Sequence, residues 1–130
     1  MLAMDGNTAT YMQYAYARIR SIFRKGDEDE QALRTAAPTP ALADGHERSL
    51  ALQLLRFPEA LAAAAAEYKP NAITAYLWDL AKTYSGLHQN CPVLKSAPQL
   101  RRERLLLCDL TARTIQCGLH LLGIDTLERM

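Results

Sequence analysis

Two side chains near the start of the chain, Tyr14 and Arg18, have the types and spacing to bind unpaired nucleotides. Residues four apart on a helix are surface neighbours, so the aromatic ring and the guanidinium would lie side by side. Unpaired bases stack on aromatic rings, while a guanidinium hydrogen-bonds phosphate or a base edge. An amphipathic helix with a half-buried tyrosine and an arginine stem covering apolar surface gives the same pattern. The pair alone leaves both interpretations open.

The stretch 11–25 has to be helical for this pair to form, and its apolar residues support a helix. At about 100° per residue they gather on one stripe, which predicts a face buried in a core. The stripe consists of Met12, Ala15, Tyr16, Ile19, Ile22 and Phe23, and to one side of it fall Tyr11, Tyr14, Arg18 and Lys25. Asn7 or Thr8 is predicted to cap the helix, and Gly26 to end it.

Four further helices are predicted from apolar periodicity and from glycine, proline or asparagine at their ends. They cover 47–57, 59–68, 72–90 and 99–122. The segment 26–45 carries acidic residues and prolines, which predicts a mobile surface connection with a short helical turn around 31–34. No stretch alternates as a strand would. The prediction is one all-α domain over 1–130, an antiparallel bundle of about five helices.

Composition excludes several classes of protein. The net charge of +1 is not that of a general nucleic-acid binder, although a local basic face is compatible with it. Three cysteines without a CxxC pair predict neither a disulfide framework nor a zinc site, but buried free thiols in a reducing cytoplasm. No run approaches the roughly 20 apolar residues of a membrane span.

Catalytic chemistry is not predicted for this chain. The histidines His46, His88 and His120 are scattered, and core or boundary positions suit them better than a metal site. No common hydrolase, metalloprotease or nucleotide-binding motif occurs. We therefore expect no catalytic residue, no metal ligand and no cofactor in these 130 residues.

Several motifs follow one another along the whole chain. They are GNTATYMQYAYARIRSI at 6–22, LQLLRFPEA at 52–60, Tyr84 followed by CPVL at 91–94, RLLLCDLTART at 104–114, GLHLLGI at 118–124 and ERM at 128–130. In this order they resemble the C-terminal anticodon-binding (DALR-type) domain of class I arginyl-tRNA synthetases. The resemblance implies a fragment of an arginine–tRNA ligase. Its partners would be the anticodon arm of arginine tRNA and the ligase's own catalytic domain, in the cytoplasm and without a membrane.

In that family a separate catalytic domain uses ATP to join arginine to its tRNA. The signatures of that domain are absent here, so the resemblance implies an enzyme only for the parent ligase, and an inactive chain by itself. The family's Tyr-Ala-x-x-Arg pattern falls on Tyr14 and Arg18, which the resemblance thus assigns to RNA binding. Tyr84 and Met130 resemble positions that line the family's anticodon-loop pocket.

The predicted RNA-binding set is completed by Tyr11 and Lys25, which flank the pair on the helix edge. Further cations are predicted to contact the phosphate backbone of the RNA stem: Arg20, Arg24 and the arginines at the start of the last helix, Arg101, Arg102 and Arg104. An alternative function stays open, because exposed tyrosine and arginine are also typical of protein–protein contacts. A helical interaction domain without an RNA role would bind its partner with little dependence on salt.

Overall fold

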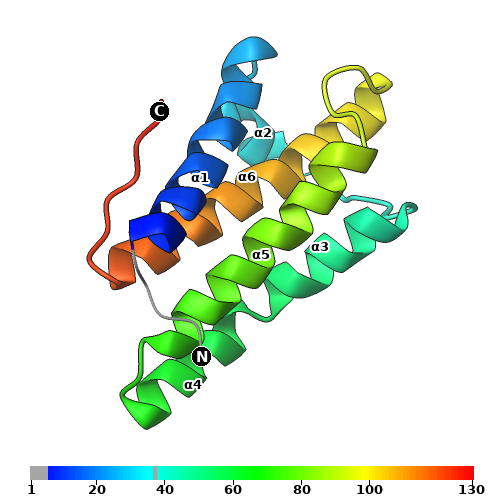
Figure 1. Ribbon diagram of the computed structural model, residues 1–130. Coiled ribbons are helices and arrows are strands. Elements are labelled where there is room, and N and C mark those ends of the chain that lie inside the picture. Colours follow the sequence, from blue (N-terminus) through cyan, green and yellow to red (C-terminus); the bar gives the residue numbers. More distant parts are fainter. Residues whose placement is uncertain (1–5, 37) are drawn as a thin grey trace.

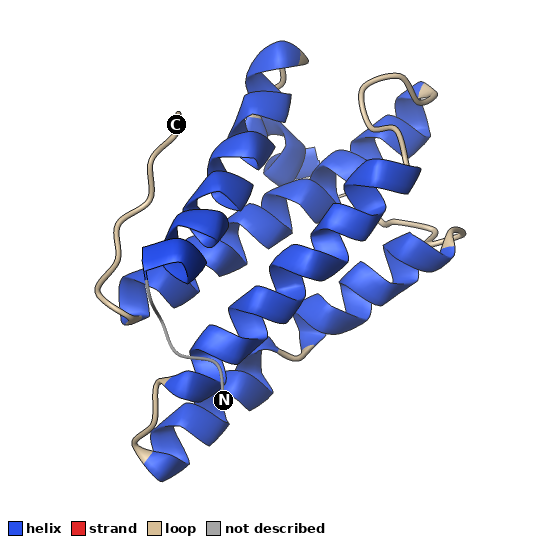
Figure 2. Ribbon diagram, in the orientation of Figure 1, coloured by secondary structure: helices blue, strands red, loops and turns tan. Residues whose placement is uncertain are grey.

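The computed structural model describes residues 6–36 and 38–130, and within these ranges the chain forms six helices and no strand (Figures 1 and 2). The helices are α1 (Gly6–Lys25), α2 (Glu30–Ala36), α3 (Gly45–Leu55), α4 (Phe57–Glu67), α5 (Asn71–Asn90) and α6 (Pro98–Leu121). The all-α prediction is confirmed, and the last four helices lie within two residues of their predicted ends. None of the described helices is long and apolar enough to cross a membrane.

The bundle is built around α5 and α6, which pack against each other and run in opposite directions (Figure 1). Helix α1 packs on one side of this pair and α3 on the other, while α4 contacts α5 and α2 contacts α6. Close contact between the central helices depends on Gly118, because a Cβ there would lie 2.7 Å from Cδ2 of Leu77. This arrangement leaves one long edge of α1 facing solvent.

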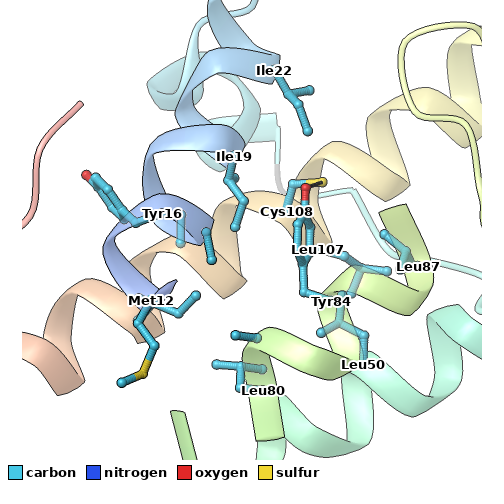
Figure 3. Close-up of a cluster of buried hydrophobic side chains, with 14 of the residues drawn as sticks. Met12, Tyr16, Ile19, Ile22, Leu50, Leu80, Tyr84, Leu87, Leu107 and Cys108 are labelled. Carbon is cyan, nitrogen blue, oxygen red and sulfur yellow. Dashed lines mark hydrogen bonds between the residues drawn. The ribbon is translucent and has the colours of Figure 1, made fainter. Parts of the chain in front are cut away.

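The core contains every residue of the apolar stripe predicted for α1. Met12, Tyr16, Ile19 and Ile22 of this stripe are labelled in Figure 3. Its largest fully buried side chains come from α1, α3, α5 and α6: Met12, Ile19, Phe23, Leu50, Leu77, Leu80, Leu87, Leu105, Ile115 and Leu119. Leu33 of α2 is nearly as well buried. Cys91 and Cys108 are buried free thiols as predicted, and burial raises the pKa of Cys108 to about 12. Cys117 is exposed, so the prediction fails for that residue.

Two predictions about chain segments are wrong. Helix α1 begins at Gly6, so Asn7 and Thr8 lie within the helix and not at the position before it; the rest of the predicted lead-in, 1–5, lies outside the described residues. In the segment 26–45, the helical turn predicted around 31–34 is confirmed as α2, but the segment is not simply a mobile connection. Leu33 of α2 is buried, and Arg34 donates two hydrogen bonds to the carboxylate of Asp109 on α6, at 2.9 and 2.8 Å. These contacts make α2 part of the fold.

Candidate nucleic-acid interface

The predicted pair lies on the solvent-facing edge of α1. Tyr14 keeps 49% of its surface exposed, and Arg18, one turn further along, is exposed as well. Within the described residues, Arg18 makes no salt bridge. An uncovered ring therefore stands beside a guanidinium with free donors, which is the arrangement that the sequence predicted.

On one side of this pair is a hollow of about 510 Å³, here called the tail hollow. Its lining comes from α1 and the last two residues: Tyr14, Ala17, Arg18, Ser21, Arg24, Lys25, Arg129 and Met130. Four of these side chains are cationic and none is a carboxylate. The fold thus concentrates positive charge on one face of a chain whose net charge is only +1.

On the other side lies a hollow of about 280 Å³ between α1 and α5, here called the α1/α5 hollow. It is lined by Tyr11, Tyr14, Ala15, Arg18, Tyr84, Ser85, His88 and Gln89. Tyr14 and Arg18 border both hollows and form the ridge between them. Each of the six residues predicted to bind RNA lines one hollow or the other.

Tyr84 forms the floor of the α1/α5 hollow. Only 4% of its surface is exposed, and its hydroxyl lies 4.0 Å from Sγ of Cys108, among core side chains (Figure 3). Burial raises the pKa of Tyr84 well above its usual value, so the phenol stays neutral. Its ring stacks on His88 with centroids 6.0 Å apart. Tyr84 can offer an edge to a ligand but cannot serve as an open stacking platform.

The hollow also contains groups that the sequence did not single out. His88 lies at the rim, and burial together with the charges of Arg18 and Lys25 lowers its pKa below the usual 6.5. Tyr11 packs on Trp78, with ring centroids 4.9 Å apart. His88 is part of the lining, whereas Trp78 only supports Tyr11 from outside it. Both belong to α5, and only the packing of α5 on α1 brings them beside this edge.

Arg20 cannot meet an RNA backbone as predicted. It is 5% exposed and donates hydrogen bonds to Asp109 at 2.9 Å and to Glu30 at 3.3 Å. Asp109 is fully buried, and both Arg20 and Arg34 bind its carboxylate. Burial by itself raises the pKa of Asp109, but the hydrogen bonds from Arg34 and Arg20 outweigh it and lower the pKa. This ion network is structural.

Two of the arginines at the start of α6 are also engaged inside the protein. Arg101 donates to Glu28 at 2.7 Å and to the Gly26 carbonyl at 2.9 Å. Arg104 is buried and donates to Glu47 at 2.8 Å. The prediction that these two contact phosphate is therefore wrong, because a carboxylate from another element binds each of them. Arg24 and Arg102 remain exposed.

One group among the described residues has the geometry to hold a metal ion. Ligand atoms of Asp44, His46 and Cys91 lie within 4.8 Å of one another. The Asp44 carboxylate already accepts the His46 backbone N–H at 2.7 Å, which caps α3, and the Cys91 thiol at 3.3 Å. We assign the group to helix capping.

All three histidines are exposed, so the prediction of core or boundary positions is wrong.

Comparisons with known proteins agree on one family. The family model described as the DALR anticodon binding domain matches residues 12–130. The arginine–tRNA ligases of Proteus mirabilis and Salmonella arizonae are 47% and 48% identical over 131 aligned positions. These alignments cover the whole chain, which spans only 22% of either relative's length.

Solved structures show the same fold. Thermus thermophilus arginyl-tRNA synthetase superposes with a TM-score of 0.81 at 38% identity, over 98% of this chain and 22% of that one. A putative arginyl-tRNA synthetase from Campylobacter jejuni gives a TM-score of 0.83 at 25% identity, over 95% of this chain and 27% of that one.

Proposed function

This chain belongs to the DALR anticodon binding domain family, and we propose that it binds the anticodon arm of arginine tRNA through the Tyr14–Arg18 edge of α1. Its curated relatives are arginine–tRNA ligases of about five times its length. We infer that it acts as the RNA-binding part of such a ligase in the cytoplasm. The ATP-dependent attachment of arginine would belong to a catalytic domain outside these 130 residues.

The observation that carries this proposal is the ridge of Tyr14 and Arg18 between two hollows. A base splayed out of the anticodon loop stacks on the Tyr14 ring, and the Arg18 guanidinium hydrogen-bonds the base edge or the adjoining phosphate. Stacking of one base on an aromatic side chain contributes about 1–3 kcal/mol by alanine substitution. Hydrogen bonds to a charged donor are about twice as strong as neutral ones.

The tail hollow recognises the RNA mainly by charge, and the α1/α5 hollow by its size and hydrogen-bonding groups. The tail hollow, with four cationic and no acidic side chains in its lining, attracts the phosphates of the loop. The α1/α5 hollow offers hydrogen-bonding groups on Ser85, His88 and Gln89 beside the rings of Tyr11 and Tyr84. At about 280 Å³ it falls just below the range of typical small-molecule sites. This size suits a single base.

The proposal is tested by titrating a labelled anticodon stem-loop of arginine tRNA into the chain and into its Tyr14→Ala variant. We expect Tyr14→Ala to weaken binding about 5- to 150-fold, the equivalent of the 1–3 kcal/mol above. The matched control is Tyr68→Ala, because Tyr68 is 94% exposed and ends α4, away from both hollows. A stem-loop with a scrambled loop tests sequence preference.

Equal binding by the Tyr14→Ala variant and the unchanged chain would refute the stacking role of Tyr14. Equal binding of the two loops by the unchanged chain would refute base recognition by this domain alone.

A second candidate function has one observation in its favour. Leu52 and Leu55, at the end of α3, are 60% and 76% exposed, across the bundle from α1. Exposed leucines of this kind suit a contact with another protein domain. Salt separates the two functions. RNA affinity falls steeply between 50 and 200 mM salt, whereas an apolar contact changes little.

A further inference from the structure

The last seven residues, Ile124–Met130, form an extended segment that follows α1 along its length and is here called the strap (Figure 1). The chain turns back after α6 because Gly123 adopts a φ of +79° and the Ile124 N–H donates to the Leu119 carbonyl at 2.9 Å. The strap ends with Arg129 and Met130 in the lining of the tail hollow. It therefore supplies one wall of the proposed RNA site.

Apolar burial does not explain how the strap is held in place. Ile124 packs against the core, but Leu127 and Met130 are each more than half exposed. The strap has no helix or strand of its own to fix its backbone. Its position beyond Ile124 must come from polar contacts with the helices.

Two glutamines make such contacts from different helices. Gln13 of α1 donates its side-chain N–H to the Asp125 carbonyl at 2.8 Å. Gln116 of α6 donates to Oγ1 of Thr126 at 3.1 Å and to the hydroxyl of Tyr16 at 3.2 Å. The amide of Gln116 thus joins the strap to both α6 and α1.

Tyr16 provides a second link. Its hydroxyl points away from the core, on the side of α1 that the strap follows (Figure 3). The hydroxyl accepts hydrogen bonds from Gln116 and from Nε of Arg20, at 3.2 and 3.3 Å. Burial, together with the nearby Glu128 carboxylate of the strap, raises the pKa of the Tyr16 phenol. Arg20 in turn binds the buried Asp109.

We propose that Tyr16 and Gln116 are positioning residues: they hold the strap along α1 so that Met130 borders the Tyr14–Arg18 edge and helps to bind RNA. The part of this proposal that concerns RNA rests on the proposed function. The part that concerns the strap does not, because it is a statement about the free chain. The two parts are tested separately.

The first test measures backbone amide order parameters of residues 125–130 by ¹⁵N relaxation, in the chain without RNA. Tyr16→Phe removes only the hydroxyl, and Gln116→Leu removes only the amide. We expect either change to lower the order parameters of the strap from near 0.85, typical of rigid backbone, to below about 0.6. The matched control is Tyr76→Phe, which removes the hydroxyl of a similarly buried tyrosine that bonds the Gln53 carbonyl on α3.

Loss of order in both strap variants, with an ordered strap in Tyr76→Phe, supports positioning by Tyr16 and Gln116. An ordered strap in both would overturn it. Equal loss in Tyr76→Phe would also overturn it, because the effect would then come from general destabilisation.

The second test titrates the anticodon stem-loop into the same variants, with Tyr14→Ala alongside. Gln116→Leu is expected to weaken binding about three- to tenfold, the usual range for one lost hydrogen-bonded link, while the thermal midpoint stays close to that of Tyr76→Phe. If Tyr14→Ala binds as tightly as the unchanged chain, the stacking role of Tyr14 fails and the strap result still stands. If Tyr14→Ala binds weakly but the strap variants bind normally, the role of the strap in RNA binding is overturned.

Discussion

Arg18 and Arg20 stand two residues apart on α1, yet Arg18 belongs to an exposed basic edge and Arg20 to a buried ion network. Arg18 is exposed, without a salt bridge among the described residues, on the edge between the two hollows. Arg20 is 5% exposed, 2.9 Å from the carboxylate of Asp109, with its guanidinium 5.2 Å from the Tyr16 ring centroid. The first arginine is available to a ligand, whereas the second is committed to the fold.

The difference follows from what packs against each position. Two residues correspond to about 200° around a helix, so side chains 18 and 20 point in nearly opposite directions. Position 20 faces α6 and α2, where Asp109 and Glu30 lie, and a buried cation has to be paired. Position 18 faces solvent. The availability of an arginine for RNA is therefore decided by carboxylates on other elements.

The largest effect on stability is expected from disrupting the buried ion network around Asp109. Asp109→Ala leaves Arg20 buried without its main partner and removes both hydrogen bonds of Arg34. Loss of one member of a buried ion pair costs about 3–5 kcal/mol, so we expect the free energy of unfolding in urea to fall by that amount. Asp79→Ala, at an exposed position of α5, is the control and should stay within about 0.5 kcal/mol. A similar loss in both variants would remove the distinction.

Exchanging Arg18 and Arg20 separately for methionine compares the two positions directly. Arg20→Met should destabilise the fold by about 1–3 kcal/mol, less than Asp109→Ala, because Arg34 still pairs with Asp109. Arg18→Met should leave stability within about 0.5 kcal/mol but weaken stem-loop binding about tenfold or more. Urea unfolding and RNA titration on both variants check this. An Arg18→Met variant that loses stability but not affinity would reverse our assignment.

The salt dependence of binding measures how many cations near the Tyr14–Arg18 edge contact phosphate. Arg24→Gln or Lys25→Gln should each reduce the slope of log K against log salt by about 0.7, the contribution of one phosphate contact on a single strand. Arg101→Gln should leave the slope unchanged, since Glu28 already binds that guanidinium. Titrations at several salt concentrations give the slopes. A reduced slope for Arg101→Gln would mean that RNA also contacts arginines that are paired inside the protein.

The smallest effect concerns pH. Burial and the charges of Arg18 and Lys25 lower the pKa of His88 below 6.5, so this side chain is neutral at pH 7. A polyanion in the hollow favours the protonated form, and we expect affinity to rise about two- to fivefold from pH 7.5 to pH 5.5. The free energy of unfolding falls over the same range as pH drops below 6.5. The reason is that His88 takes up its proton at a higher pH in the unfolded chain than in the folded one.

Titrations of His88→Gln should show no such rise in affinity, while His120→Gln, on α6, should retain it. A rise that survives in His88→Gln would assign the titration to another group.

Local periodicity was enough to predict α1 and its two faces. The apolar stripe from Met12 to Phe23 is buried as expected, and Tyr14 and Arg18 are neighbours on the exposed edge. Both statements depend only on the turn of a helix, which places residues three and four apart on the same face. The sequence also predicted four of the other helices, because breakers bound them.

Contacts between distant parts of the chain were not predictable in this way. Nothing near Arg20 in the sequence indicates that Asp109, 89 residues away, will bind it. The strap is similar, since Gln13 meets Asp125 across 112 residues. Such pairs depend on how the helices pack, and a single sequence contains no periodic signal for them.

The sequence by itself determined an all-α chain with an aromatic and basic edge on its first helix, together with its family resemblance. Tertiary structure alone decided which cations remain free, where the strap ends and which groups of α5 complete the hollow. The physical reason is one of range. Helical geometry fixes neighbours within a few residues, whereas burial and ion pairing depend on every element that packs against a position.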